Sequence, residues 1–247
     1  MIYVNGDSWS QPSNYPWEDY SWPKLLEKKI AHPVINHSAG CGSNNRMLSG
    51  LQNFYIQGHR PNLVIIALST FGRFSIPGDR MSNWTIGYSG WGHNDRSGKH
   101  IKQTIDWWND ELYDELAFVY NNYKIIWQIH EFCNQYMNCP VIFFNAYDQK
   151  FFEFQKEIFG SETELTNWVN SRVLDQLDFS TFEYIDGFKF FKNQSKNWVI
   201  DNTCWHDMLS TKLIDDKTGR HPGHPSPQGH KLISDYVFKN IENLIKF

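Results

Sequence analysis

A serine that could act as a nucleophile lies in the tripeptide Gly6-Asp7-Ser8, close to the N-terminus. The tripeptide directly follows the apolar run Ile2-Tyr3-Val4, which predicts a buried first strand. In an open α/β sheet, functional groups gather outside the carboxyl ends of the strands. A serine on the tight turn after such a strand would expose its hydroxyl, and its own N–H could point at a developing oxyanion. Alternatively, Asp7 or Ser8 simply caps the start of a loop or helix.

A glycine-rich turn follows the second predicted strand, Val34-Ile35-Asn36. Its sequence is His37-Ser38-Ala39-Gly40-Cys41-Gly42-Ser43-Asn44. Closely spaced glycines let the backbone approach a substrate, and backbone N–H groups can donate hydrogen bonds to an oxyanion. The alternative is an ordinary strand-to-helix turn in which Ser43 or Asn44 is the N-cap.

Three histidines, His221, His224 and His230, lie within ten residues near the C-terminus. His224 stands between two prolines, two residues before Ser226, which we expect to cap the last helix. The prolines would hold its imidazole rigidly, and a serine hydroxyl needs such a base because it is a poor nucleophile near neutral pH. The three histidines could alternatively bind a metal. No acidic or cysteine ligand lies between them at ligand spacing, so we expect no metal.

Taken together, these three segments resemble the SGNH (GDSL-like) hydrolase superfamily, and the resemblance covers nearly the whole chain in order and spacing. Within that superfamily the chain looks most like divergent members found in bacteriophage genomes. The resemblance implies a flavodoxin-like α/β fold, a three-layer α/β/α sandwich with a parallel sheet of about five strands. It also implies esterase, lipase, deacetylase or related acyl-transfer chemistry without a cofactor.

The resemblance assigns roles to four positions of the chain. Ser8 matches the nucleophile and His224 the general base, while Gly42 matches the glycine of the oxyanion hole, with Gly40 as the competing alignment. Attack on an ester would then place an oxyanion between the N–H groups of Ser8 and Gly42. Water activated by His224 would hydrolyse the acyl-Ser8 intermediate.

The chain departs from the family pattern after the third predicted strand. Family members usually have Gly-x-Asn-Asp there, and the Asn side chain completes the oxyanion hole. The corresponding stretch is Ser69-Thr70-Phe71-Gly72, so that Phe71 occupies the Asn position. The candidates for a replacement donor are Thr70, Asn44 and Arg73.

A second departure concerns the acidic residue that orients the catalytic histidine. The family places an Asp three residues before that histidine, and this chain has His221 there. Asp215 or Asp216 could serve as the orienting carboxylate. Otherwise the site is a Ser–His dyad.

Alternating strand and helix patterns position these residues and predict one domain over residues 1–247. We expect further buried strands at residues 63–68 and 141–145. We expect a first helix that begins at Ser21 and three more at residues 43–58, 101–137 and 165–174. A last helix begins at Ser226 and runs towards the C-terminus. Residues 71–100 are rich in Gly, Ser, Asn and Trp and predict an irregular insertion or lid. Residues 178–223 are weakly patterned.

Composition excludes several classes of protein. The 247 residues carry a formal net charge of −4 without a long basic run, so we expect no nucleic-acid partner. None of the four cysteines has the two-residue spacing of a zinc or redox motif, which favours free thiols, although one disulfide remains open. There is no secretory signal pattern and no membrane-spanning apolar run. We therefore expect a cytoplasmic protein with no membrane partner, or a virion component if a phage encodes it.

Aromatic residues make up 17% of the chain, with 11 Trp, and this leaves two interpretations open. The rings can form a large core, or Trp84, Tyr88 and Trp91 can form a sugar-stacking surface. We expect a serine ester hydrolase acting on a small ester or an acylated carbohydrate. The alternative is a non-catalytic carbohydrate-binding or virion-associated module. The absent Asn and Asp favour the module, whereas Ser8, His224 and the glycines favour the enzyme.

Overall fold

The computed structural model describes residues 1–11, 21–30, 32–40, 42–69, 73–77, 83–87, 115–145, 183–186 and 227–245. The helix expected at residues 165–174 lies outside these ranges, as does the first part of the one expected at 101–137.

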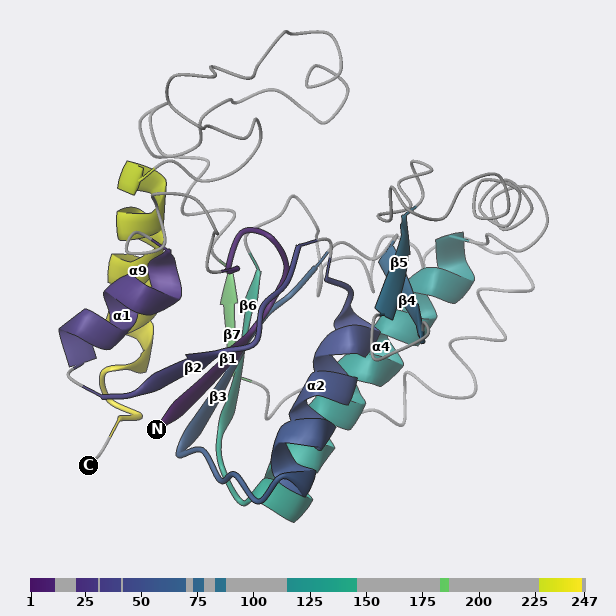
Figure 1. Ribbon diagram of the computed structural model, residues 1–247, viewed down its shortest axis with the longest axis horizontal. Coiled ribbons are helices and arrows are strands. Elements are labelled where there is room, and N and C mark those ends of the chain that lie inside the picture. The colour runs from purple at the N-terminus through teal and green to yellow at the C-terminus, as the bar shows by residue number, and fades with distance from the viewer. Residues whose placement is uncertain are drawn as a thin grey trace, which may run out of the picture.

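Five parallel strands form the central sheet. They are β1 (Ile2–Asn5), β2 (Val34–Asn36), β3 (Leu63–Ala67), β6 (Val141–Asn145) and β7 (Glu183–Asp186). Their order across the sheet is β2-β1-β3-β6-β7 (Figure 1). This is the flavodoxin-like order, in which the direction of sheet growth reverses between β1 and β3. The expected fold class is therefore confirmed, and the reversal point is where such sheets bind ligands.

Helices cover both faces of the sheet, which gives three layers (Figure 1). The helices α2 (Asn44–Ile56) and α4 (Glu115–Phe132) pack together over one face, and α1 (Trp22–Ile30) and α9 (Pro227–Ile241) pack together over the other. Every residue of β1 and β3 is buried, because alternate side chains along each strand enter the two apolar layers. This explains why continuous apolar runs identified the central strands.

The helix ends follow the local sequence. The predicted helix at residues 43–58 is α2, and the chain leaves it through Gly58, whose φ of +89° favours glycine. The long helix predicted up to residue 137 is α4 followed by a π-helical turn at Cys133–Met137. Asn138, in the left-handed conformation with φ of 51°, ends it.

Two strand segments correct the sequence predictions. Within the insertion expected to be irregular, β4 (Arg73–Pro77) and β5 (Asn83–Gly87) pair as an antiparallel hairpin. Both segments alternate apolar and polar residues, the two-residue period of a strand. The apolar positions are Phe74, Ile76, Trp84 and Ile86. The edge strand β7 lies within the weakly patterned residues 178–223, where a run of four residues gives little periodicity to detect.

Two cysteines fall in the described part of the chain, and both Cys133 and Cys139 are buried free thiols, as the sequence favours. Among the helices that the structure describes, none is long and apolar enough to cross a membrane.

Candidate active site

The chain leaves β1 through Gly6, at a point where no side chain fits. A Cβ at Gly6 would lie 2.8 Å from Ser10 Oγ and 2.9 Å from Ala67 Cβ. The Gly6 N–H donates to Asn5 Oδ1 at 2.9 Å, which fixes the turn at the end of the strand. Glycine is therefore required here by a close approach between the turn and the end of β3.

Ser8 lies on a compact turn organised by Asp7. The Asp7 carbonyl accepts the N–H groups of Ser10 and Gln11, each at 3.0 Å, and Asp7 Oδ1 accepts the Trp9 N–H at 3.0 Å. These three hydrogen bonds occupy the N–H groups of Trp9, Ser10 and Gln11. Ser8 itself is partly exposed at the carboxyl end of β1, as expected for a nucleophile.

The other carboxylate oxygen of Asp7 forms an ion pair with Arg73, the first residue of β4. Asp7 Oδ2 and Arg73 Nη1 are 2.7 Å apart, and the side chains are only 2% and 11% exposed, respectively. The same Nη1 donates to Ser69 Oγ at 3.1 Å. The pair thus links the nucleophile turn to the chain that follows β3, across the reversal point of the sheet. At least one N–H of Arg73, predicted as a candidate oxyanion donor, is engaged here.

Asn44, another candidate oxyanion donor, is fully buried. Its Nδ2 donates to Asn122 Oδ1 at 2.7 Å and to the Ser69 carbonyl at 3.2 Å, and its Oδ1 accepts the Ser69 N–H at 2.9 Å. An amide nitrogen carries two hydrogens, so both are directed at protein acceptors in this structure. Asn44 instead fixes the start of α2 to the end of β3.

The glycine turn after β2 packs directly on the nucleophile turn. A Cβ at Gly42 would lie 2.8 Å from the Gly6 carbonyl oxygen and 3.4 Å from Asp7 Cα. The Ala39 N–H donates to the same Gly6 carbonyl at 3.2 Å. Gly42 is therefore beside Ser8's turn, where the proposed oxyanion role needs it.

The two candidate glycines differ in where their N–H groups go. The Gly42 N–H donates to the Ala39 carbonyl at 2.9 Å, so it would have to be shared or turned to reach an oxyanion. Gly40 is exposed, and its N–H has no hydrogen-bond partner within the described ranges. Gly40, the competing candidate for the oxyanion glycine, therefore has a backbone N–H that is available to bind an oxyanion.

Trp22, at the start of α1, connects the nucleophile turn to the last helix. Its indole Nε1 donates to Ser10 Oγ at 3.0 Å, and its backbone N–H donates to His230 Nδ1 at 3.3 Å. His230 therefore caps the N-terminus of α1 from α9, with Nδ1 unprotonated. This contact fixes α1 against α9.

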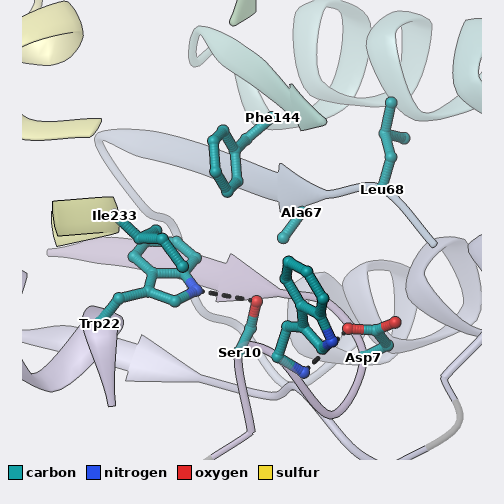
Figure 2. Close-up of a pocket in the computed structure, with 8 residues that line it drawn as sticks. Asp7, Ser10, Trp22, Ala67, Leu68, Phe144 and Ile233 are labelled. Carbon is teal, nitrogen blue, oxygen red and sulfur yellow. Dashed lines mark hydrogen bonds between the residues drawn. The ribbon is translucent and has the colours of Figure 1, made fainter. Parts of the chain in front are cut away.

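Beneath the turn, a small cavity of about 10 Å³ separates the nucleophile turn from the sheet and α9 (Figure 2). It is lined by Asp7, Trp9, Ser10, Trp22, Ala67, Leu68, Phe144 and Ile233. This volume holds at most about one water molecule. The turn that carries Ser8 therefore packs on Trp22, Phe144 and Ile233 with almost no empty volume between them.

Several predicted site residues lie outside the described ranges. They are Thr70, Phe71, Asp215, Asp216, His221 and His224. Their roles remain predictions. No group of three potential metal ligands occurs among the residues that the structure describes, and two of the three clustered histidines are not among them.

Sequence reasoning missed the polar groups that hold these loops together. Asn5, in the buried strand β1, donates to the Tyr3 hydroxyl at 2.9 Å while accepting from Gly6. Ser69 and Asn122 anchor Asn44. An Asn inside an otherwise apolar strand was the available signal for Asn5, since buried amides require partners.

Comparisons with known proteins find similar solved structures but no similar family or curated sequence. No family profile and no curated protein sequence matches the chain. Esterase EstA from Pseudoalteromonas sp. is 15% identical, covering 98% of this chain and 96% of that one, with a TM-score of 0.49. A lipolytic protein of the G-D-S-L family from Veillonella parvula is 12% identical, covering 96% of each chain, with a TM-score of 0.46.

A carbohydrate esterase is 11% identical, with a TM-score of 0.47, and covers 98% of this chain and 67% of that one. At these values the likeness carries no activity, substrate or site residue over to this chain. The strand order and the Gly-Asp-Ser turn are observed in this chain itself. The solved structures to which the chain is similar thus include two esterases and a lipolytic protein of the G-D-S-L family.

Proposed function

We propose that the protein is a serine ester hydrolase that acts through an acyl-Ser8 intermediate on a small ester or an acylated carbohydrate. The observation that carries this proposal is the position of Ser8 on a fixed turn at the carboxyl end of β1. Gly42 packs against that turn, and Asp7 anchors it to Arg73. A nucleophile needs this combination of partial exposure and fixed geometry.

In the proposed reaction, Ser8 Oγ attacks the ester carbonyl while His224 accepts the hydroxyl proton. The Ser8 N–H and a second N–H from the glycine turn stabilise the oxyanion. Collapse of the tetrahedral intermediate expels the alcohol, which takes the proton from His224. Water then attacks the acyl-Ser8 ester with His224 again as base, and releases the acid.

The oxyanion hole is the weak part of this site, because Asn44 is engaged elsewhere and Phe71 replaces the usual Asn. Loss of one donor typically lowers turnover by about 10²–10³. We therefore propose a slow esterase. The same two observations support the second candidate, a non-catalytic carbohydrate-binding module.

Hydrolysis of p-nitrophenyl acetate tests the proposal. Wild type should release p-nitrophenol, and Ser8→Ala should abolish the release without changing the melting temperature. Ser49→Ala is the matched control, because Ser49 is an exposed serine within α2 that bonds only its own helix. Equal activity in wild type and Ser8→Ala contradicts the proposal. An inert wild type that binds an acetylated glycan supports the binding module.

A further inference from the structure

Ser8 lies inside a small ring that the side chain of Asp7 closes. Asp7 Oδ1 accepts the Trp9 N–H at 3.0 Å, and this hydrogen bond spans the whole of Ser8. A carboxylate that accepts the N–H two residues later forms an Asx-turn, which holds the residue between them in one backbone conformation. The directions of the Ser8 N–H and of the Ser8 side chain therefore depend on where the Asp7 carboxylate is held.

Arg73 holds that carboxylate by its other oxygen. Arg73 Nη1 is 2.7 Å from Asp7 Oδ2, and the two side chains are almost completely buried. A hydrogen bond between two charged groups is short and strong, and burial protects it from competing water. A carboxylate is a rigid plane, so a contact that fixes Oδ2 also fixes Oδ1, the oxygen that closes the turn around Ser8. The position of Arg73 is thus transmitted to Ser8 through one side chain.

Arg73 is itself fixed by the end of β3. Its Nη1 also donates to Ser69 Oγ at 3.1 Å. The Ser69 N–H and carbonyl are both bonded to the side chain of Asn44, in the first turn of α2, and both residues are fully buried. The same helix packs against β4, the strand that begins with Arg73. Buried polar contacts therefore run without a break from α2 through Arg73 to the nucleophile turn.

The charge of Arg73 bears on the proposed reaction as well as its position. Asp7 directly precedes Ser8, where attack on an ester would develop a negative charge. A nearly buried carboxylate at this position repels a developing oxyanion, and such repulsion is strongest where water is excluded. The guanidinium of Arg73 compensates the charge of Asp7. Arg73 would therefore favour the oxyanion without donating a hydrogen bond to it.

We infer that Arg73 is a positioning residue of the proposed esterase and acts on Ser8 through the Asp7 carboxylate. It holds the Asx-turn that encloses Ser8 and compensates the charge of Asp7 beside the oxyanion. This inference rests on the proposed function, and it gives Arg73 an indirect role in place of the direct oxyanion contact that the sequence allowed. An ion pair that only stabilises the fold would change activity only when the protein unfolds.

Steady-state kinetics with p-nitrophenyl acetate, measured well below the unfolding temperature of every variant, separate these two roles. Arg73→Gln should lower kcat by about tenfold or more and leave KM nearly unchanged, because the loss is confined to the transition state. Arg73→Lys retains the charge and should lose less turnover than Arg73→Gln. Lys29→Gln is the control and should leave kcat unchanged, since it removes an ion pair with Asp235 that joins α1 to α9.

The double variant Asp7→Asn/Arg73→Gln tests the charge. Asp7→Asn retains an oxygen that can accept the Trp9 N–H but removes the carboxylate charge. The double variant should therefore be about threefold or more faster than Arg73→Gln, yet slower than wild type, because its turn is no longer held by an ion pair. It leaves neither charge of the pair in place and serves alone if Arg73→Gln does not fold. A double variant that equals wild type, or that is no faster than Arg73→Gln, overturns the inference.

Amide hydrogen exchange tests the positioning without catalysis. Relative to the Val64 N–H, which donates to the Pro140 carbonyl at the amino end of β3, the Trp9 N–H should exchange about tenfold or more faster in both variants than in wild type. Unchanged relative exchange at Trp9 overturns the inference even if esters are hydrolysed. Faster exchange at Trp9 in a protein that hydrolyses no ester retains Arg73 as the residue that holds the turn and removes the esterase.

Discussion

Asp7 and Arg73 form a nearly buried ion pair, 2.7 Å between Oδ2 and Nη1, that joins the residue before Ser8 to the first residue of β4. The same arginine nitrogen donates to Ser69, at the end of the β3 segment. The turn after β1 and the chain that follows β3 are thus joined by side chains at the reversal point of the sheet. Asn44 reinforces this link from α2.

Breaking the ion pair from one side should be costly. Asp7→Asn or Arg73→Gln should each lower the free energy of unfolding by about 3–5 kcal/mol, because each leaves a buried charge unpaired. The double variant should lose less than the sum, which urea denaturation of the four proteins can measure. Additive effects within about 0.5 kcal/mol would show that the pair has no coupling.

The two candidate glycines provide a matched comparison. Gly42→Ala places a Cβ 2.8 Å from a backbone oxygen, so the turn must move, whereas Gly40→Ala meets only the end of the flexible Gln11 side chain at 3.0 Å. Gly42→Ala should destabilise the protein by about 1–3 kcal/mol and reduce esterase turnover at least tenfold. Gly40→Ala should change both little. The reverse order would show that the Gly40 alignment is the functional one.

The histidines at the C-terminal end should separate into a base and a cap. His224→Ala should lower turnover by at least about 10²-fold, the usual contribution of a general base. His230→Ala removes the acceptor of the Trp22 N–H and should mainly lower stability, by about 1 kcal/mol. Steady-state kinetics and thermal unfolding of both variants distinguish the roles. A larger turnover loss in His230→Ala would refute His224 as the base.

Asn44 should behave as a structural residue. Asn44→Ala removes the hydrogen bonds of Asn44 to Asn122 Oδ1 and to the Ser69 backbone and should cost about 1–3 kcal/mol of stability. Asn53→Ala, at an exposed position of the same helix, is the control and should be nearly neutral. Should Asn44→Ala abolish turnover while its unfolding curve matches wild type, Asn44 would be an oxyanion donor after all.

Restoring the family residue tests the oxyanion hole. Phe71→Asn should raise turnover, by up to about 10²-fold, if it supplies a missing donor. Thr70→Ala should then have little effect in the wild-type background. If Thr70→Ala alone abolishes turnover in a fast wild-type enzyme, Thr70 has replaced the Asn and the prediction of a slow esterase fails.

The sequence predicts the central sheet well because parallel strands covered on both faces leave uninterrupted apolar runs, as at β3 (Leu63–Ala67). The position of Ser8 could also be predicted, because a Gly-Asp-Ser turn that directly follows a buried strand must lie at the carboxyl end of that strand. The hairpin of β4 and β5 was missed because the glycine- and tryptophan-rich sequence of residues 71–100 concealed its alternation of apolar and polar residues.

The contacts that fix the site could not be predicted from local pattern. Asp7 and Arg73 are separated by 66 residues, and Asn44 and Asn122 by 78. The first pairing depends on how the turn after β1 meets the chain that follows β3, and the second depends on how α2 packs against α4. No periodicity along the chain encodes either contact. Asn122 in particular has the appearance of a surface residue in a helix, yet it is 2% exposed.

Reaction of the purified protein with a fluorophosphonate, followed by mass spectrometry of its peptides, reports directly whether Ser8 is an activated nucleophile. We expect one adduct per chain, located on the peptide that contains Ser8 and absent from Ser8→Ala. An adduct on another serine, or robust esterase activity in a protein that the probe does not label, would contradict the assignment of Ser8 as nucleophile.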